Sequence, residues 1–167
     1  MGKANLFPDF RDLLKSLNSA GVRYLVIGGY AVIYYGYHRA TDDIDLWIAI
    51  DPENTEKVSR ALIEFGGFAD ATVKPSMFQT RGKVFIFGKE PSRVDILTSP
   101  SAVNFEESYA RRHVADFDGI KVPLISFADL KKNKLASGRN KDLADVENLP
   151  PTWPWPEESK GKRRKQP

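Results

Sequence analysis

Two aspartates near the start of one apolar segment have a type and a spacing that suit metal-ion chemistry. Asp43 and Asp45 are separated by one residue at the beginning of a β-rich stretch, so both side chains point to the same face of the predicted strand. Aspartate is depleted in strands and neighbouring carboxylates repel, so this arrangement costs stability unless a cation compensates. Such oxygen ligands suit Mg²⁺, which takes one or two carboxylates and leaves its other positions to water and phosphates. The alternative is a solvated strand end with two surface acids.

A third aspartate has the same kind of surroundings. Asp95 stands between branched apolar residues in the sequence Arg93-Val94-Asp95-Ile96-Leu97, and a neighbouring strand could bring it beside the first pair. Three convergent carboxylates can hold two metal ions and stabilise the attacking and leaving oxygens of an in-line phosphoryl displacement. The third can also accept the proton of the attacking hydroxyl. The alternative for Asp95 is a structural salt bridge with Arg93 or Arg81.

A glycine pair supplies a possible phosphate contact. Gly28 and Gly29 follow an apolar strand and precede a short helix. Glycine lets the backbone approach a phosphate closely, and the beginning of a helix offers free N–H groups and the positive end of its dipole. Taken alone, the pair would be an ordinary tight turn.

Apolar periodicity and turn signals predict the elements that must position these residues. The expected helices are 8–19, 30–37, 53–65, 105–112, 126–136 and 141–149. The expected strands are 23–27, 44–50 and two hairpins, 84–87 with 93–97 and 113–117 with 120–125. Residues 68–82 should be a loop with at most one short strand.

The mixed order of helices and strands predicts an α+β fold. We expect a mixed sheet of four or five strands flanked by helices, with short C-terminal helices, in one domain that covers residues 1–149. Residues 150–167 are rich in proline and basic residues, and we expect a disordered tail. Trp153 and Trp155 in this tail fit either a peptide ligand or a cover for the domain surface.

Composition narrows the class of protein and the kind of site. The 167 residues carry a net charge of +3, and all of this excess lies in the tail beyond Trp155, so the domain itself is neutral. With no cysteine and two histidines, a thiolate site is excluded and any metal site depends on carboxylates. The apolar stretch 24–37 is interrupted by glycines and is too short to span a membrane. We therefore expect a cytoplasmic protein without a membrane partner.

The motifs together resemble the nucleotidyltransferase superfamily of the DNA polymerase β type. Its signature is a strand, a Gly-Gly or Gly-Ser turn, a short helix, Asp-x-Asp on the next strand and a later lone Asp. Gly28-Gly29, Asp43-x-Asp45 and Asp95 match it in order. The segments 22–31, 39–45 and 134–145 are similar to minimal bacterial nucleotidyltransferases and to nucleotidyltransferase-type toxins of toxin–antitoxin and phage-defence modules. The resemblance spans about residues 8–149.

The resemblance implies nucleotide contacts around the glycine turn. Gly28, Gly29 and Tyr30 match the turn and the start of its helix. Many active members have a serine at the second turn position, whose hydroxyl contacts the phosphate, whereas Gly29 leaves only backbone contacts. Arg39 and Thr41 come just before the carboxylate strand, where phosphate contact and simple loop solvation are the two alternatives.

Residues near the C-terminal helix break are further candidates. Lys134 and Lys141 flank Gly138, where a side chain can point into a cleft and contact nucleotide phosphates. The alternative is an ordinary solvated helix face. Asp142 and Asp145 fit acids favoured by the helix dipole better than metal ligands.

The resemblance implies a two-metal, Mg²⁺-dependent enzyme that transfers a nucleoside monophosphate from an NTP, with ATP as the expected donor, and releases pyrophosphate. Asp43 and Asp45 would hold the metals, and Asp95 would complete the site and activate the acceptor hydroxyl. The acceptor could be RNA such as tRNA, a protein or a small molecule, and its choice would depend on a partner protein, a homodimer or the C-terminal helices. The alternative is a non-catalytic binding or antitoxin subunit with the same fold. A third interpretation is a nucleic-acid-binding module driven by the basic tail.

Overall fold

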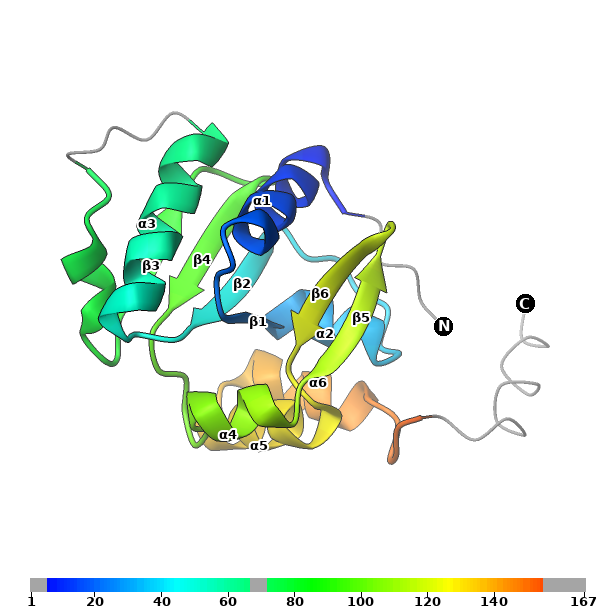
Figure 1. The fold of residues 1–167 in the computed structure, drawn as a ribbon. Helices are drawn as coiled ribbons and strands as arrows, with labels where there is room; N and C mark the ends of the chain where they lie inside the picture. Colours follow the sequence, from blue (N-terminus) through cyan, green and yellow to red (C-terminus); the bar gives the residue numbers. More distant parts are fainter. Residues whose placement is uncertain (1–5, 67–71, 155–167) are drawn as a thin grey trace.

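A six-stranded mixed sheet forms the centre of the fold in the computed structural model, which describes residues 6–66 and 72–154 (Figure 1). The strands are β1 (Tyr24–Ile27), β2 (Asp43–Ile48), β3 (Val84–Phe87), β4 (Arg93–Leu97), β5 (His113–Phe117) and β6 (Ile120–Leu124). Their order is β3-β4-β2-β1-β6-β5. The central strand β2 runs antiparallel to β1 and parallel to β4. Asp45 of β2 is therefore the register partner of both Ile27 at the end of β1 and Asp95 of β4.

Helices pack on both sides of this sheet. They are α1 (Pro8–Ser19), α2 (Gly28–Tyr34), α3 (Pro52–Gly66), α4 (Phe105–Ala110), α5 (Phe127–Ser137) and α6 (Asn140–Asn148), with a 3-10 helix, η1, at Pro75–Gln79. Helices α1 and α3 lie side by side in front of the strands in the view of Figure 1, whereas α4, α5 and α6 group at the bottom of the picture. The lower group adjoins the sheet face that carries the aspartates.

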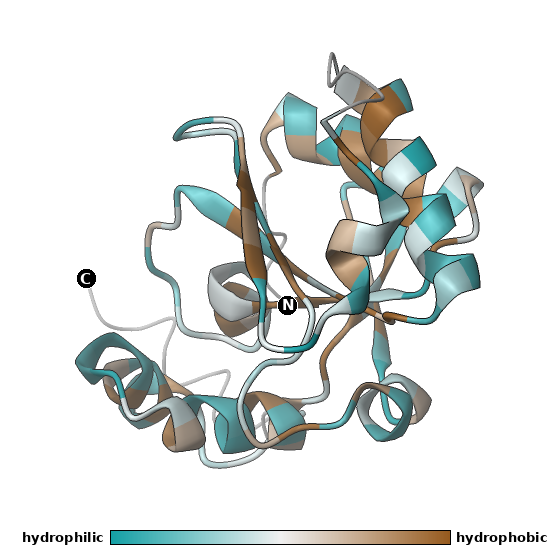
Figure 2. Ribbon diagram, turned by 90° about the vertical axis from the view of Figure 1, so that its left-hand side faces the viewer, coloured by the Kyte–Doolittle hydropathy of each residue, from teal (hydrophilic) through white to brown (hydrophobic). Residues whose placement is uncertain are grey.

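Local sequence patterns explain why these segments bury the faces that they do. In α1 the apolar residues recur at helical spacing, and Phe10, Leu13, Leu14 and Leu17 are almost completely buried. In β2, Ile44, Leu46 and Ile48 alternate with Asp43, Asp45 and Trp47, so one face of the strand is wholly apolar. Figure 2 shows the strands largely in the colours of apolar residues and the outer helices as alternating polar and apolar.

The structure confirms the predicted α+β fold and extends the predicted sheet. Both hairpins are present, and both join the same sheet, which therefore has six strands rather than four or five. The second hairpin is attached through β6, which runs parallel to β1. This long-range pairing leaves no periodic signal in the sequence. In the described part of the predicted loop, residues 72–82, the regular element is η1 rather than a strand.

Two predicted boundaries near the site were wrong. Helix α2 spans Gly28–Tyr34 instead of 30–37, so the glycine pair is the first turn of the helix rather than a separate turn before it. Strand β2 spans Asp43–Ile48 instead of 44–50, which puts both aspartates inside the paired strand. Pairing with β1 and β4 outweighs the low strand propensity of aspartate.

The start of the predicted tail lies against the domain. The ring of Trp153 contacts Tyr34, Tyr35 and His113, with ring centroids 4.9–6.0 Å apart, so this tryptophan covers the domain surface. Residues 155–167, which include Trp155 and the basic cluster, lie outside the described residues, so the predicted disorder there stays a prediction. None of the described helices combines the length and the apolar character that crossing a membrane would require.

Candidate active site

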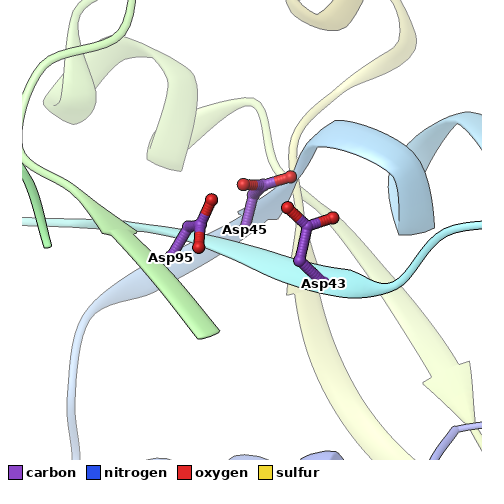
Figure 3. A group of neighbouring side chains, drawn as sticks. All are labelled: Asp43, Asp45 and Asp95. Atoms are coloured by element: carbon purple, nitrogen blue, oxygen red, sulfur yellow. The ribbon is translucent and has the colours of Figure 1, made fainter. Parts of the chain in front are cut away.

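The three predicted aspartates converge on one side of the sheet. Asp45 in β2 is the register partner of Asp95 in β4, and Asp43 lies two residues before Asp45 on the same face. One carboxylate oxygen from each residue lies within 4.8 Å of the others. Figure 3 shows the three carboxylates projecting in the same direction from the two neighbouring strands. The parallel register of β2 and β4 thus builds the acidic cluster that the sequence predicted.

An arginine neutralises part of this cluster. Arg93, the register partner of Asp43, donates from Nη2 to Asp43 Oδ2 at 2.9 Å. It also donates from Nε and Nη2 to the two oxygens of Asp95 at 2.9 and 3.0 Å. The salt bridge that was the structural alternative for Asp95 is therefore present, and it lies within the cluster of three acids. Alternation along β4 puts Arg93 and Asp95 on one face, which is the signal in the sequence for this contact.

Asp45 differs from the other two acids because no hydrogen-bond donor among the described residues reaches its carboxylate. Burial raises the pKa of Asp45, and the charges of Asp43 and Asp95 raise it further, to about 7, although Lys134 and Arg93 oppose the shift. In this environment the nearby positive charge does not fully compensate the negative charge of an ionised Asp45 carboxylate. A metal ion at the cluster would supply it.

The first glycine of α2 is required by contact with Asp45. Gly28 has φ +66°, and a Cβ there would lie 2.8 Å from Asp45 Cγ and still closer to one carboxylate oxygen. Any side chain at this position would displace Asp45, and the left-handed backbone disfavours one as well. The backbone of the turn therefore reaches the carboxylate cluster directly.

The second glycine leaves room for side chains from another segment. A Cβ on Gly29 would lie 2.6 Å from Thr41 Oγ1 and 3.3 Å from Arg39 Nη1. The hydroxyl of Thr41 also lies 3.2 Å from Asp43 Oδ1, within hydrogen-bonding distance. A hydroxyl and a guanidinium thus occupy the space beside the first turn of α2 that a side chain of residue 29 would fill.

A cleft of about 390 Å³ opens beside Asp45 and Gly28. One wall comes from the sheet and the loops near β3 and β4, including Val84, Leu97 and Ser99. The other wall comes from α5 and α6 and includes the predicted residue Lys134, together with Asn133, Ser137, Arg139 and Asp142. The cleft therefore adjoins the carboxylate cluster on the sheet face that α4, α5 and α6 cover.

The remaining predicted residues lie in different surroundings. Lys134 is buried, with Nζ 2.8 Å from Asp142 Oδ1 and 2.8 Å from Asp145 Oδ2. Tyr30 is buried as well, and its ring packs against Phe10, with the ring centroids 5.7 Å apart. Burial, followed by the charges of two nearby aspartates, raises the pKa of Tyr30 to about 12.

Lys141 is exposed at the beginning of α6 and does not line the cleft. Since it also has no ion-pair partner within the described chain, it is available to solvent or to a ligand that reaches this edge of the molecule. Its predicted contact with nucleotide stays a prediction.

Residues 4–150 match a protein family described as "Nucleotidyltransferase of unknown function (DUF6036)". The chain belongs to this family. The predicted nucleotidyltransferase relationship is thereby confirmed over nearly the whole described domain. No curated protein sequence matches the chain significantly.

Three solved structures show that this family member shares its fold with other nucleotidyltransferase-like proteins. An antigenic nucleotidyltransferase-like protein from Paracoccidioides brasiliensis is 19% identical, with a TM-score of 0.56 over 87% of this chain and 77% of its own. TM1012 of Thermotoga maritima, a candidate nucleotidyltransferase, is 15% identical, with a TM-score of 0.57 over 88% and 96%. The lincosamide antibiotic adenylyltransferase LnuA, with lincomycin bound, is 19% identical, with a TM-score of 0.52 over 87% and 98%. At these identities the likeness concerns the fold.

The sequence analysis did not predict the partners of the two acids of α6. Asp142 lies in the first turn of α6, as predicted, but both Asp142 and Asp145 are buried against cations, and neither belongs to the carboxylate cluster. Burial alone would raise the pKa of Asp142, but hydrogen bonds from Lys134, Ser137 and Arg139 lower it to about 2. The spacing from Lys134 gave no indication of this pairing, which depends on the turn between α5 and α6.

Proposed function

We propose that the protein is a Mg²⁺-dependent nucleotidyltransferase that moves a nucleoside monophosphate from an NTP to an acceptor hydroxyl. The observation that carries the proposal is the cluster of Asp43, Asp45 and Asp95, with oxygens within 4.8 Å of one another, at the edge of a cleft. Three carboxylates that converge in this way repel one another, and this repulsion has no structural use. The cluster is therefore better explained by a bound cation than by ordinary surface acids.

The donor set fits a hard divalent cation. It consists of three carboxylates, and Asp45 lacks a hydrogen-bond donor among the described residues, so its oxygens are free to act as ligands. Asp43, Asp45 and Asp95 would hold Mg²⁺, in one or two positions. The ion would neutralise the charge that develops on the phosphoryl group as the bond to the acceptor forms.

The residues of the chain would do the remaining work. The backbone of Gly28 and Gly29, with Arg39, Thr41 and Lys134, would bind the triphosphate beside the first turn of α2. The acceptor oxygen forms a bond to the α-phosphorus while the bond from this phosphorus to the β-phosphate oxygen breaks, and pyrophosphate leaves. The acceptor proton passes to Asp95, which lies on the β4 side, across β2 from the glycine turn.

We propose ATP as the donor and RNA such as tRNA, a partner protein or a small molecule as the acceptor. LnuA, which shares the fold, is an adenylyltransferase of lincosamide antibiotics, which supports AMP transfer and a small-molecule acceptor as one possibility. A cytoplasmic role in a toxin–antitoxin or defence module, with a homodimer or a partner protein that contributes to acceptor choice, is part of the same proposal.

A second candidate is a non-catalytic binding or antitoxin subunit. The contact that favours it is Arg93, which already satisfies Asp95 and one oxygen of Asp43 without any metal. If Arg93 holds these acids permanently, the cluster is an internal salt bridge and the fold serves only for binding.

The test incubates the protein with Mg²⁺, an acceptor mixture of RNA and protein, and each NTP labelled at either the α- or the γ-phosphate. Transfer of the α label without the γ label is expected, and Asp45→Asn should abolish it. Asp12→Asn, an exposed acid of α1, is the control and should transfer normally. Transfer that survives Asp45→Asn would sink the catalytic assignment. Mg²⁺-dependent binding of NTP without any transfer supports the second candidate.

A further inference from the structure

A buried network of charged side chains connects the loop before β2 to the two C-terminal helices. Asp145 in α6 is 1% exposed, and both of its carboxylate oxygens are engaged. Arg39 donates to it from Nε at 2.7 Å and from Nη2 at 2.9 Å, and Lys134 Nζ lies 2.8 Å from Oδ2. One carboxylate therefore holds two cations that come from distant parts of the sequence.

A second carboxylate completes the network. Asp142 accepts hydrogen bonds from Lys134, Ser137 and Arg139, at 2.8 Å from Lys134 and 2.7 Å from Arg139. Three cations and two carboxylates leave one positive charge in excess. This excess lies beside the cleft, since Lys134, Arg139 and Asp142 all line it.

The two cations on Asp145 retain free donors. Lys134 has three N–H groups, of which Asp142 and Asp145 use two. Arg39 has five, and Asp145 and the Ala40 carbonyl use three. Arg39 Nη1 lies 3.3 Å from where a Cβ on Gly29 would stand, and Lys134 lines the cleft with Gly28. The free donors thus belong to one side chain beside Gly29 and to another that lines the cleft with Gly28.

We propose that Asp145 is a positioning residue, which fixes Arg39 and Lys134 as a pair for the polyphosphate of the nucleotide. Long basic side chains lose much rotamer freedom when they bind a ligand, and a carboxylate that holds them in advance removes this cost from the binding step. The inference rests on the proposed binding of an NTP and goes beyond it by assigning Asp145 to the polyphosphate half of the site.

The network has a structural alternative, in which it merely ties α6 to the rest of the domain. The chain offers a matched control for this alternative. Asp129 in α5 is 5% exposed and is held by Arg111 through two hydrogen bonds of 3.0 and 3.2 Å, and it does not line the cleft. Asp129→Asn removes a comparable buried carboxylate without touching Arg39 or Lys134.

The experiment measures binding of inorganic tripolyphosphate and of α,β-methylene-ATP by calorimetry with excess Mg²⁺. Binding of Mn²⁺ alone is followed separately by electron paramagnetic resonance. We expect Asp145→Asn to bind tripolyphosphate at least about tenfold more weakly than the wild type, because the loss of one charged hydrogen bond has an effect of this size. The affinity of Asp145→Asn for Mn²⁺ should change by less than about twofold. Asp129→Asn should change neither affinity. If Asp145→Asn does not fold, Asp145→Glu keeps the charge but displaces both cations and should weaken tripolyphosphate binding about threefold.

The outcomes separate this inference from the proposed function. Wild-type protein that binds neither tripolyphosphate nor α,β-methylene-ATP overturns the proposed function itself. Wild-type protein that binds both, with Asp145→Asn or Asp145→Glu equally tight, overturns only the role of Asp145. Equal weakening by Asp129→Asn shows that the loss is structural and overturns the positioning role as well.

Discussion

Asp45→Asn should stabilise the metal-free protein while it removes a residue that the proposed reaction needs. In the folded protein the pKa of Asp45 is raised from its ordinary value of 3.8 to about 7, by burial and by the charges of Asp43 and Asp95. A rise of this size corresponds to about 4 kcal/mol of unfolding free energy that the ionised carboxylate costs. Because water still reaches the half-buried side chain, about 4 kcal/mol is an upper limit.

The sign of the effect depends on pH. Asp45 binds its proton more tightly in the folded state, so the wild-type protein loses the contribution of this group as pH rises from about 4 to about 7. Asparagine does not titrate. The free energy of unfolding of Asp45→Asn should therefore match that of the wild type near pH 4 and exceed it by up to about 4 kcal/mol at pH 8.

Urea unfolding in EDTA, followed by tryptophan fluorescence between pH 4.5 and 8.5, measures this difference. Mg²⁺ should then stabilise the wild type at pH 8 and leave Asp45→Asn nearly unchanged, because only the wild type has the complete carboxylate cluster. Asp12→Asn, on the exposed side of α1, should stay within about 0.5 kcal/mol of the wild type throughout. If Asp45→Asn is no more stable than the wild type at pH 8 in EDTA, the carboxylate is not under electrostatic strain and the reasoning is refuted.

Three further substitutions test the surroundings of the cluster. Gly28→Ala should cost about 1–3 kcal/mol of stability and abolish Mn²⁺ binding, because its Cβ displaces Asp45. A titration followed by electron paramagnetic resonance that finds normal Mn²⁺ affinity would contradict this prediction. Gly29→Ser should lower the melting temperature and weaken ATP binding through its clash with Thr41, and the additional change Thr41→Gly should recover the melting temperature. Arg93→Gln should increase Mn²⁺ affinity about tenfold, because a competing cation is removed. Weaker Mn²⁺ binding would instead show that Arg93 holds the acids ready for the metal.

Much of the fold could be predicted because its signals are local. The α1 helix, the two hairpins and the serine cap of α5 follow from apolar spacing, turn residues and a side chain that bonds three residues ahead. The parallel pairing of β6 with β1 could not be predicted, since it joins residues about a hundred positions apart. The start of α2 was predicted two residues too late, because glycine is a poor helix former and the Gly28-Gly29 pair is typical of a turn.

Some features of the candidate site likewise follow from the local sequence, whereas others depend on the tertiary structure. The sequence by itself determined the chemical type of the cluster, because Asp43 and Asp45 share a face through strand alternation alone. The register of β2 with β4 decided that Asp95 completes the cluster and that Arg93 enters it. The turn between α5 and α6 decided that Lys134 is a buried, paired cation rather than part of a solvated helix face. Alternation is a property of neighbouring residues, whereas register and burial depend on segments that meet only in the folded chain.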